Sequence, residues 1–317
     1  MRRETRGWLE AAACVMCIGA LSLVYALGAA LGAHPVAFIL YAMIAAAVAT
    51  LAAVGAGGQA AAIARHPLSW AVGSSIILLE VFYFQTIVYV APAHGNLVLR
   101  IGIPIAMIAG WTLLGRRPLP LAIAGGVLVV AVIAYVVAVT RADVRWPMAA
   151  AGTLAGAFMV ARGLAGEFHP MNRAARTVRE KLRFTGVVVL VASLLSLALV
   201  AVATTAVAVH ALPETGMLPT AAQMLHAPTL LVGCLVGGAV LALMFYFNFS
   251  SVVAIGTENL TATMAFSPAA TWIFQEIGVA LGWIDVQRPD ARIVGAIVVC
   301  IAAVLLIFLA DVCARKP

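Results

Sequence analysis

The chain has 317 residues, of which 64% are hydrophobic and only 10% are charged, and its formal net charge is +7. Soluble domains carry about 25% charged residues. An aqueous core could not enclose apolar surface on this scale, so the sequence excludes a soluble protein and indicates an all-α polytopic membrane protein. The basic excess then indicates orientation in a membrane and not nucleic-acid binding. No nucleotide-binding loop, nucleophile motif or spaced metal cluster is present, so we expect neither an enzyme nor a cofactor.

Ten segments are apolar and long enough to cross a bilayer as helices of about 20 residues. The first follows the basic residues at positions 2, 3 and 6, but it is too long for the hydrophobic part of a signal peptide, and we expect it to be retained. The predicted spans are 8–32, 35–57, 68–92, 96–115, 119–140, 146–167, 184–209, 228–254, 258–283 and 292–311.

The distribution of basic residues predicts the orientation of these spans. With the N-terminus in the cytoplasm, most basic residues fall on the inner side and few on the outer side. An even number of spans returns the C-terminus to the cytoplasm, so we expect a bacterial-type cytoplasmic (inner) membrane protein with both termini inside. The inner residues are Arg2, Arg3, Arg6, Arg65, Arg116, Arg117, Arg173, Arg176, Arg179, Lys181, Arg183, Arg315 and Lys316, and the outer ones are Arg141, Arg145, Arg288 and Arg292.

An aromatic signature occurs twice in the chain. Phe82-Tyr83-Phe84-Gln85 is followed by Pro104, and Phe245-Tyr246-Phe247-Asn248 is followed at nearly the same interval by Pro268. Aligning the two copies divides the chain into 1–142 and 143–317, each with five spans. Because five is odd, the second set would be inserted upside down, which predicts two inverted five-helix repeats with a binding site near the bilayer midplane.

Three stretches carry a resemblance to a known family. The span 149–162 is rich in small residues, contains Gly152-x-x-x-Gly156 and ends at Arg162; Ser267-Pro268 precedes Glu276; and Pro104 precedes Leu114-Gly115-Arg116-Arg117. These resemble the EamA-like, ten-helix form of the drug/metabolite transporter (DMT) superfamily, although Arg116-Arg117 stands where the family usually has an acidic residue. The resemblance implies a central cavity between two repeats and a secondary carrier of small metabolites, often an exporter, that alternates access.

Candidate substrate-binding residues come from the polar groups inside the spans. Glu80 is a carboxyl group near the middle of an apolar helix, where such groups face a cavity or a partner. It could bind a cationic group or carry a coupling proton, or it could lock two helices together through a hydrogen bond. The hydroxyl and carboxamide groups of Tyr83, Gln85, Tyr246 and Asn248 could bind an amine or a ring, or could join helices.

Further candidates lie on the fourth and ninth predicted spans. Arg100 could attract an anionic substrate, or it could extend to the outer headgroups. Trp272 and Glu276 share a helix face and could form an outer gate or anchor the helix. Pro104 and Pro268 would kink their helices and act either as hinges or as static bends.

The leading hypothesis is therefore a carrier for an amino acid, amine or related solute. The expected partners are that small molecule and membrane lipids, with proton coupling as an option, no nucleic acid, and either a monomer or a homodimer. His34, His94, His210 and His226 all fall on the predicted outer side, which keeps open a respiratory anchor subunit that binds haem or quinone. A lipid-linked sugar flippase is a third hypothesis. The outer loop 211–229 is either a lid or a plain connector.

Overall fold

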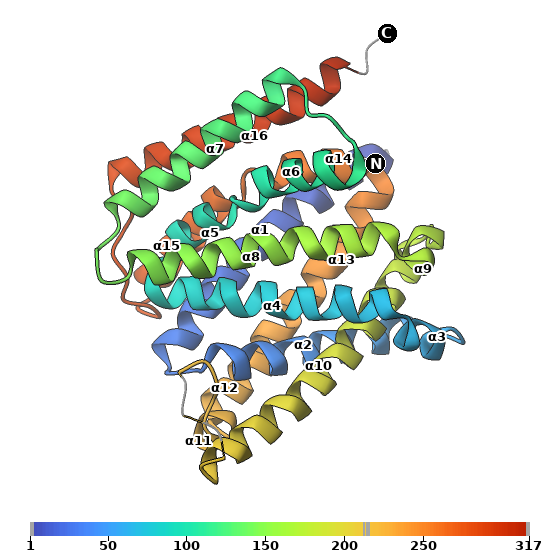
Figure 1. The fold of residues 1–317 in the computed structure, drawn as a ribbon, viewed down its shortest axis with the longest axis vertical. Coiled ribbons are helices and arrows are strands. Elements are labelled where there is room, and N and C mark those ends of the chain that lie inside the picture. Colours follow the sequence, from blue (N-terminus) through green and yellow to red (C-terminus); the bar gives the residue numbers. More distant parts are fainter. Residues whose placement is uncertain (1–2, 212, 214–215, 315–317) are drawn as a thin grey trace.

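The structure is a computed structural model that describes residues 3–211, 213 and 216–314, and the regular secondary structure of this part of the chain is entirely helical. Figure 1 shows the long helices side by side, with the N-terminal end of α1 and the C-terminal end of α16 toward the same side of the molecule. The elements are α1 (Arg3–Ala30), α2 (Pro35–Val54), α3 (Ala60–Arg65), α4 (Pro67–Tyr89), α5 (Pro92–Leu99), α6 (Gly102–Leu114), α7 (Pro120–Val139), α8 (Arg145–Phe168), α9 (Pro170–Ala174), α10 (Val178–Ala208), α11 (Ala221–Met224), α12 (Ala227–Leu231), the π-helix η1 (Val232–Gly237), α13 (Gly238–Ile255), α14 (Thr257–Met264), α15 (Ser267–Ala280) and α16 (Ala291–Ala314).

Within the described residues, nine helical stretches are long and apolar enough to cross a membrane. They include Pro92–Leu114, which joins α5 and α6, and Ala227–Ile255, which joins α12, η1 and α13. The predicted span 258–283 is divided between the two short helices α14 and α15. The prediction of a polytopic α-helical membrane protein is confirmed, and the tenth span stays a prediction.

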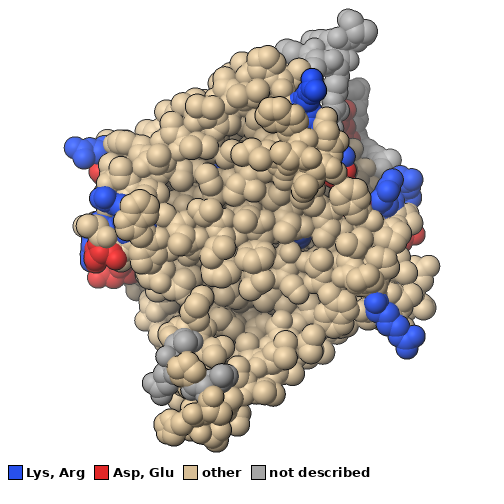
Figure 2. Space-filling view, in the orientation of Figure 1, with Lys and Arg blue, Asp and Glu red and all other residues tan. Residues whose placement is uncertain are grey.

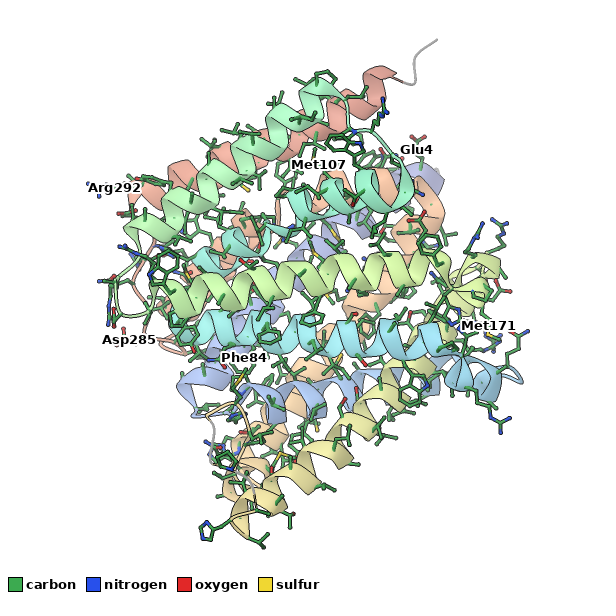
Figure 3. All side chains as sticks on the ribbon, viewed as in Figure 1. Glu4, Phe84, Met107, Met171, Asp285 and Arg292 are labelled. Carbon is green, nitrogen blue, oxygen red and sulfur yellow. The ribbon has the colours of Figure 1, made fainter. Side chains whose placement is uncertain are left out.

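The surface has the distribution of charge that a bilayer requires. Lysine, arginine, aspartate and glutamate gather at two opposite ends of the view, with a broad uncharged band between them (Figure 2). Figure 3 places Asp285 and Arg292 at one end and Met171 at the other, with Phe84 between them. Large apolar side chains of the candidate spans are exposed, such as Leu199 at 60% and Val298 at 61%, because lipid replaces water as their solvent.

The helix α1 lies at the centre of the packing. It contacts α13, α15 and α4, while α4 packs along α8, and α2 packs against α10 and α13. The helices α7 and α16 form a pair (Figure 1). The main core forms around Tyr25, whose ring stacks on Phe84 at 5.1 Å between centroids and meets the edge of Phe38 at 6.0 Å.

Three helices begin with the same histidine–proline pair. His34, His66 and His169 stand immediately before the first residue of α2, α4 and α9, and that residue is a proline each time. The Nδ1 atom of each histidine accepts a hydrogen bond from the backbone N–H two residues further on, at 3.2–3.3 Å. The imidazole therefore satisfies one of the free donors of the first turn, as serine or aspartate does in other helices.

The predicted glycine motif on α8 allows a close approach to the backbone between α5 and α6. A Cβ atom on Gly156 would come within 2.8 Å of the backbone nitrogen of Gly102, and one on Gly152 within 2.4 Å of the Val98 side chain. These two glycines let α8 lie directly against the junction between α5 and α6.

Candidate functional site

Two helical segments are interrupted, the candidate span Pro92–Leu114 and the region of the predicted span 258–283, and the interruptions have the same local geometry. Helices α5 and α6 are separated at Arg100 and Ile101, and α14 and α15 are separated at Ala265 and Phe266. At each interruption two consecutive backbone N–H groups donate to the carbonyl three residues earlier, which tightens the chain into a turn. This geometry ends one helix and starts the next.

The two predicted hinge prolines directly follow the interruptions. Pro104 and Pro268 lie in the first turn of α6 and α15, just after each interruption. In the first turn a backbone N–H has no partner inside its own helix, so proline fits there without breaking a hydrogen bond. The breaks lie within the four residues that precede each proline, and a role of Pro104 and Pro268 as hinges stays a prediction.

A chain of buried hydrogen bonds joins the two interrupted segments. The Arg100 guanidinium donates from Nη2 to Ser267 Oγ at 2.6 Å and to Asn96 Oδ1 at 3.0 Å. The Ser267 hydroxyl donates to the same Asn96 oxygen at 2.9 Å. Asn96 Nδ2 in turn donates to the Tyr83 hydroxyl at 3.0 Å. Arg100 and Asn96 come from α5, Ser267 from α15 and Tyr83 from α4.

The chain continues into α1. The Tyr83 and Ser22 hydroxyl oxygens lie 2.6 Å apart, and Ser22 Oγ donates to the Ile18 carbonyl at 2.8 Å. Ser22 must then accept from Tyr83, so every donor between Arg100 and Ile18 points the same way. The last member is Thr271 of α15, whose Oγ1 atom lies 3.3 Å from Ser22 Oγ. We call Ser22, Tyr83, Asn96, Arg100, Ser267 and Thr271 the central polar network; each is at most 7% exposed.

Gln275 makes a second link between the same two segments. Its side chain is fully buried, and its Oε1 atom accepts from the backbone N–H of Ala93, in the first turn of α5, at 3.1 Å. Its amide nitrogen donates to the Gln287 carbonyl at 3.2 Å. Gln275 of α15 thus caps the N-terminus of α5, and this contact holds the two interrupted segments in register.

Arg100 is the member of the network with an unbalanced charge. It is 7% exposed, and none of the described ion pairs involves it. Burying a guanidinium without a counter-ion costs several kcal/mol, on the order of the penalty for any lone ion in a protein interior. Its side chain points into the protein, so the alternative in which it reaches the headgroups is wrong.

Glu80 is buried near the central polar network, and its carboxylate already accepts a hydrogen bond within the protein. The Tyr25 hydroxyl donates to its carboxylate at 2.8 Å, which joins α1 to α4. The charge of Arg162 on α8 also acts on Glu80, although no ion pair within 4.0 Å forms between them. The geometry agrees with the locking role for Glu80, and the Tyr25 and Tyr83 rings, 6.0 Å apart, separate it from the network.

The polar residues of the second aromatic signature, Tyr246 and Asn248, do not lie beside those of the first, Tyr83 and Gln85. Tyr246 lies on α13 with 36% of its surface exposed and receives a hydrogen bond from Arg6 Nη2 at 3.4 Å. Asn248 is half-buried beside Cys14 of α1. Gln85 is half-buried on α4, and none of the described hydrogen bonds involves its side chain. Of the repeated residues, only Tyr83 belongs to the central polar network.

Trp272 and Glu276 lie near the Asp285 end of the bundle. The indole nitrogen of Trp272 donates to Glu276 Oε1 at 3.2 Å, and the other carboxylate oxygen pairs with Arg288 at 3.2 Å. Glu276 therefore joins α15 to the loop that follows it. This arrangement agrees with the anchoring alternative better than with a free gate residue.

The loop 211–229 and two of the four histidines on the predicted outer side, His34 and His226, make local contacts. The described part of the loop 211–229 folds against α2 and α10, where Tyr41 donates to the Met224 carbonyl and Thr204 to the Pro219 carbonyl, both at 2.8 Å. Residues 212, 214 and 215 lie outside the described part.

His34 caps α2, and His226 Nδ1 lies 2.8 Å from Thr229 Oγ1. Among the described residues, no group of three or more histidine, cysteine, aspartate or glutamate side chains is placed to hold a metal ion.

Sequence reasoning missed Ser22, Tyr25, Asn96, Thr271 and Gln275. Asn96 could have been found, because it stands four residues before Arg100 and therefore on the same helix face. Ser22, Thr271 and Gln275 carry no such signal, since single polar residues in apolar helices are common and their partners lie about 60 to 250 residues away along the chain.

No family model and no curated protein matches the chain. Its structure is similar to a solved structure titled "Crystal structure of protein", with a TM-score of 0.59 and 16% sequence identity over 99% of this chain and 100% of that one. At this identity the likeness shows a shared fold. Fold and site together define a polytopic α-helical membrane protein with two interrupted segments joined by a buried polar network.

Proposed function

We propose that this protein is a secondary carrier that moves a small metabolite across the cytoplasmic membrane by alternating access. In this proposal the chain consists of two inverted five-helix repeats, 1–142 and 143–317, with both termini in the cytoplasm, and export is the expected direction. The drug/metabolite transporter superfamily, which the sequence resembles, is the family to which it would belong.

The observation that carries this proposal is the pair of interrupted segments. Carriers with repeated halves bind substrate where discontinuous helices from the two halves meet, because a broken helix exposes backbone and polar groups inside the bilayer. Here α5/α6 and α14/α15 break with the same turn, each just before a proline, and Arg100, Asn96 and Ser267 connect them. An anchor subunit has no need for two such breaks, and two of the four histidines on the predicted outer side, His34 and His226, make local hydrogen bonds.

The membrane topology can be tested first. Fusion of green fluorescent protein to the C-terminus should give fluorescence, and fusion of alkaline phosphatase should give no activity, because the fluorescent protein folds in the cytoplasm and the phosphatase outside it. A fusion after residue 143 should give the reverse result, since the loop between the predicted spans 119–140 and 146–167 lies outside in this topology. Two fusions on the same side of the membrane would contradict the inverted arrangement, and swapped results would contradict the predicted orientation.

Transport itself is tested in proteoliposomes loaded with labelled amino acids, amines or organic acids, with and without a proton gradient. The informative variant is Tyr83→Phe, which removes only the hydroxyl that links Asn96 to Ser22. Its matched control is Tyr135→Phe, because Tyr135 is 43% exposed on α7. Flux that is reduced in Tyr83→Phe and normal in Tyr135→Phe supports the proposal. No flux for any solute would refute it.

Glu80→Gln tests the optional proton coupling. If Glu80 carries the proton, this variant loses the dependence of flux on the proton gradient while exchange of substrate without a gradient remains. If the dependence persists, Glu80 only joins α1 to α4 through Tyr25, and the coupling group lies elsewhere.

A further inference from the structure

The unbalanced charge of Arg100 indicates what kind of molecule the central polar network binds. Its protein partners are a carboxamide oxygen, a hydroxyl and a backbone carbonyl, and all of these are neutral. The two titratable side chains that influence it electrostatically are the Cys300 thiol and the Tyr83 phenol, and neither type of group is ionised near neutral pH. The described residues therefore offer a buried cation with no anion to balance it.

Part of the guanidinium is also still free to bind. Nε and Nη2 are used within the protein, whereas no described residue accepts a hydrogen bond from Nη1. Among the described residues, Nη1 is also not one of the fully enclosed polar atoms that lack a partner. A guanidinium presents parallel N–H groups that match the two oxygens of a carboxylate.

The other charges near the centre do not compete for this role. The Glu80 carboxylate accepts from Tyr25 and lies within the field of Arg162, so it is not a free acid for a cationic substrate. Glu276 is paired with Arg288. Of the buried charges at the interrupted segments, Arg100 is thus the one that still lacks an opposite charge among the described residues.

We infer that Arg100 binds the carboxylate of the transported molecule at the junction of α5/α6 and α14/α15, so that the substrate class is a small organic acid or another carboxylate-bearing metabolite and not a simple amine. Ser267, Asn96 and Tyr83 hold the guanidinium in position. This inference rests on the proposed carrier function, because it assigns the substrate of the same site.

The test is a binding comparison between benzoate, benzamide and phenylethylamine, which share the ring and differ in charge. Binding is measured by calorimetry on the full-length protein in lipid nanodiscs, with empty nanodiscs as the blank. Benzoate should bind about 10- to 100-fold more tightly than benzamide, as expected for a charge-assisted contact. Arg100→Gln should remove this preference, whereas Arg145→Gln, which changes an arginine bonded to backbone carbonyls outside the network, should keep it.

A second measurement keeps the inference testable if Arg100→Gln does not fold. Wild-type protein is treated with phenylglyoxal, which modifies arginine, and the extent of modification at Arg100 is read by mass spectrometry. Benzoate should protect Arg100 and benzamide should not, while modification of Arg145 should be the same in both. Equal modification of Arg100 with either compound would overturn the inference.

Other outcomes separate the inference from the carrier proposal. If chloride displaces benzoate at matching concentrations and itself binds as tightly, the site takes an inorganic anion and the carboxylate assignment is wrong. If phenylethylamine binds and is transported while benzoate does neither, the carrier proposal is supported and the assignment of a carboxylate site at Arg100 is wrong. If benzoate binds through Arg100 but no organic acid is transported in proteoliposomes, the carboxylate site is supported and the carrier proposal is wrong.

Discussion

Arg100 and Ser267 are 167 residues apart in the sequence, and a hydrogen bond of 2.6 Å joins them at the two interrupted segments. Ser267 accepts from the guanidinium and donates to Asn96, so one hydroxyl serves both neighbours. The bond fixes the C-terminal end of α5 against the first residue of α15.

Replacement of Ser267 by alanine should destabilise the protein by about 1–3 kcal/mol, because it leaves a buried guanidinium and a buried carboxamide oxygen each short of one hydrogen bond. The free energy of unfolding can be measured by titration with sodium dodecyl sulfate from mild detergent. Ser251→Ala is the matched control, since Ser251 is equally buried but bonds only to the carbonyl of Asn248 within its own helix. Equal losses in the two variants would show that the network contributes nothing specific.

Replacement of Gly156 by alanine should cost about 1–3 kcal/mol through overpacking. The new Cβ would lie 2.8 Å from the nitrogen and 3.2 Å from the Cα atom of Gly102, and backbone atoms cannot move aside as a side chain can. Gly163→Ala on the same helix is the control, because nothing lies within 4 Å of its Cβ position and alanine is the better helix former. Thermal unfolding in detergent should rank Gly156→Ala below wild type and Gly163→Ala at or above it.

Tyr25→Phe should destabilise the protein more than Glu80→Gln does. The first change leaves the buried carboxyl without its donor, whereas the amide oxygen of glutamine still accepts the hydrogen bond from Tyr25. We expect a loss of about 1–3 kcal/mol for Tyr25→Phe. The double variant should lose less than the sum of the single variants, since both act on one bond. Additive losses would mean that the 2.8 Å contact is not a stabilising bond.

The thermal stability should fall as the pH decreases below about 6.5, the ordinary pKa of histidine. Burial, together with the neighbouring His66, lowers the pKa of His169. The folded state therefore takes up its proton at a lower pH than the unfolded state does. Between the two pKa values the unfolded state binds more protons, so stability rises with pH and is lost on acidification.

The structural reason for this pH dependence is that both ring nitrogens of His169 are used in the neutral form. Nδ1 accepts from the Met171 N–H, and Nε2 lies 2.9 Å from Ser69 Oγ, which donates to the Ile63 carbonyl. A proton on Nδ1 would remove the cap of α9. His169→Asn keeps a capping acceptor without a titrating group, so its melting temperature should depend less on pH. The control His210→Gln, at an exposed position, should behave as wild type does.

Long apolar segments and few charges were enough to predict a polytopic helical protein and nine of its spanning stretches. The physical reason is that a bilayer accepts only chain whose backbone groups are satisfied within a helix, so composition and length decide this level of structure. Tyr83 and Arg100 were also found in this way, because an intramembrane polar group is costly and stands out from its neighbours.

The partners of those residues depended on the packing of the helices. Helices that are apolar on every side give no periodic signal to show which face meets protein and which meets lipid, so Tyr246 and Asn248 were expected beside Tyr83 and instead lie against α1. The breaks at Arg100 and Ala265 were read as kinks at Pro104 and Pro268, since proline marks the start of a helix as readily as a bend. Arg100 meets Ser267 because α5 packs against α15, a contact between distant segments that no local pattern predicts.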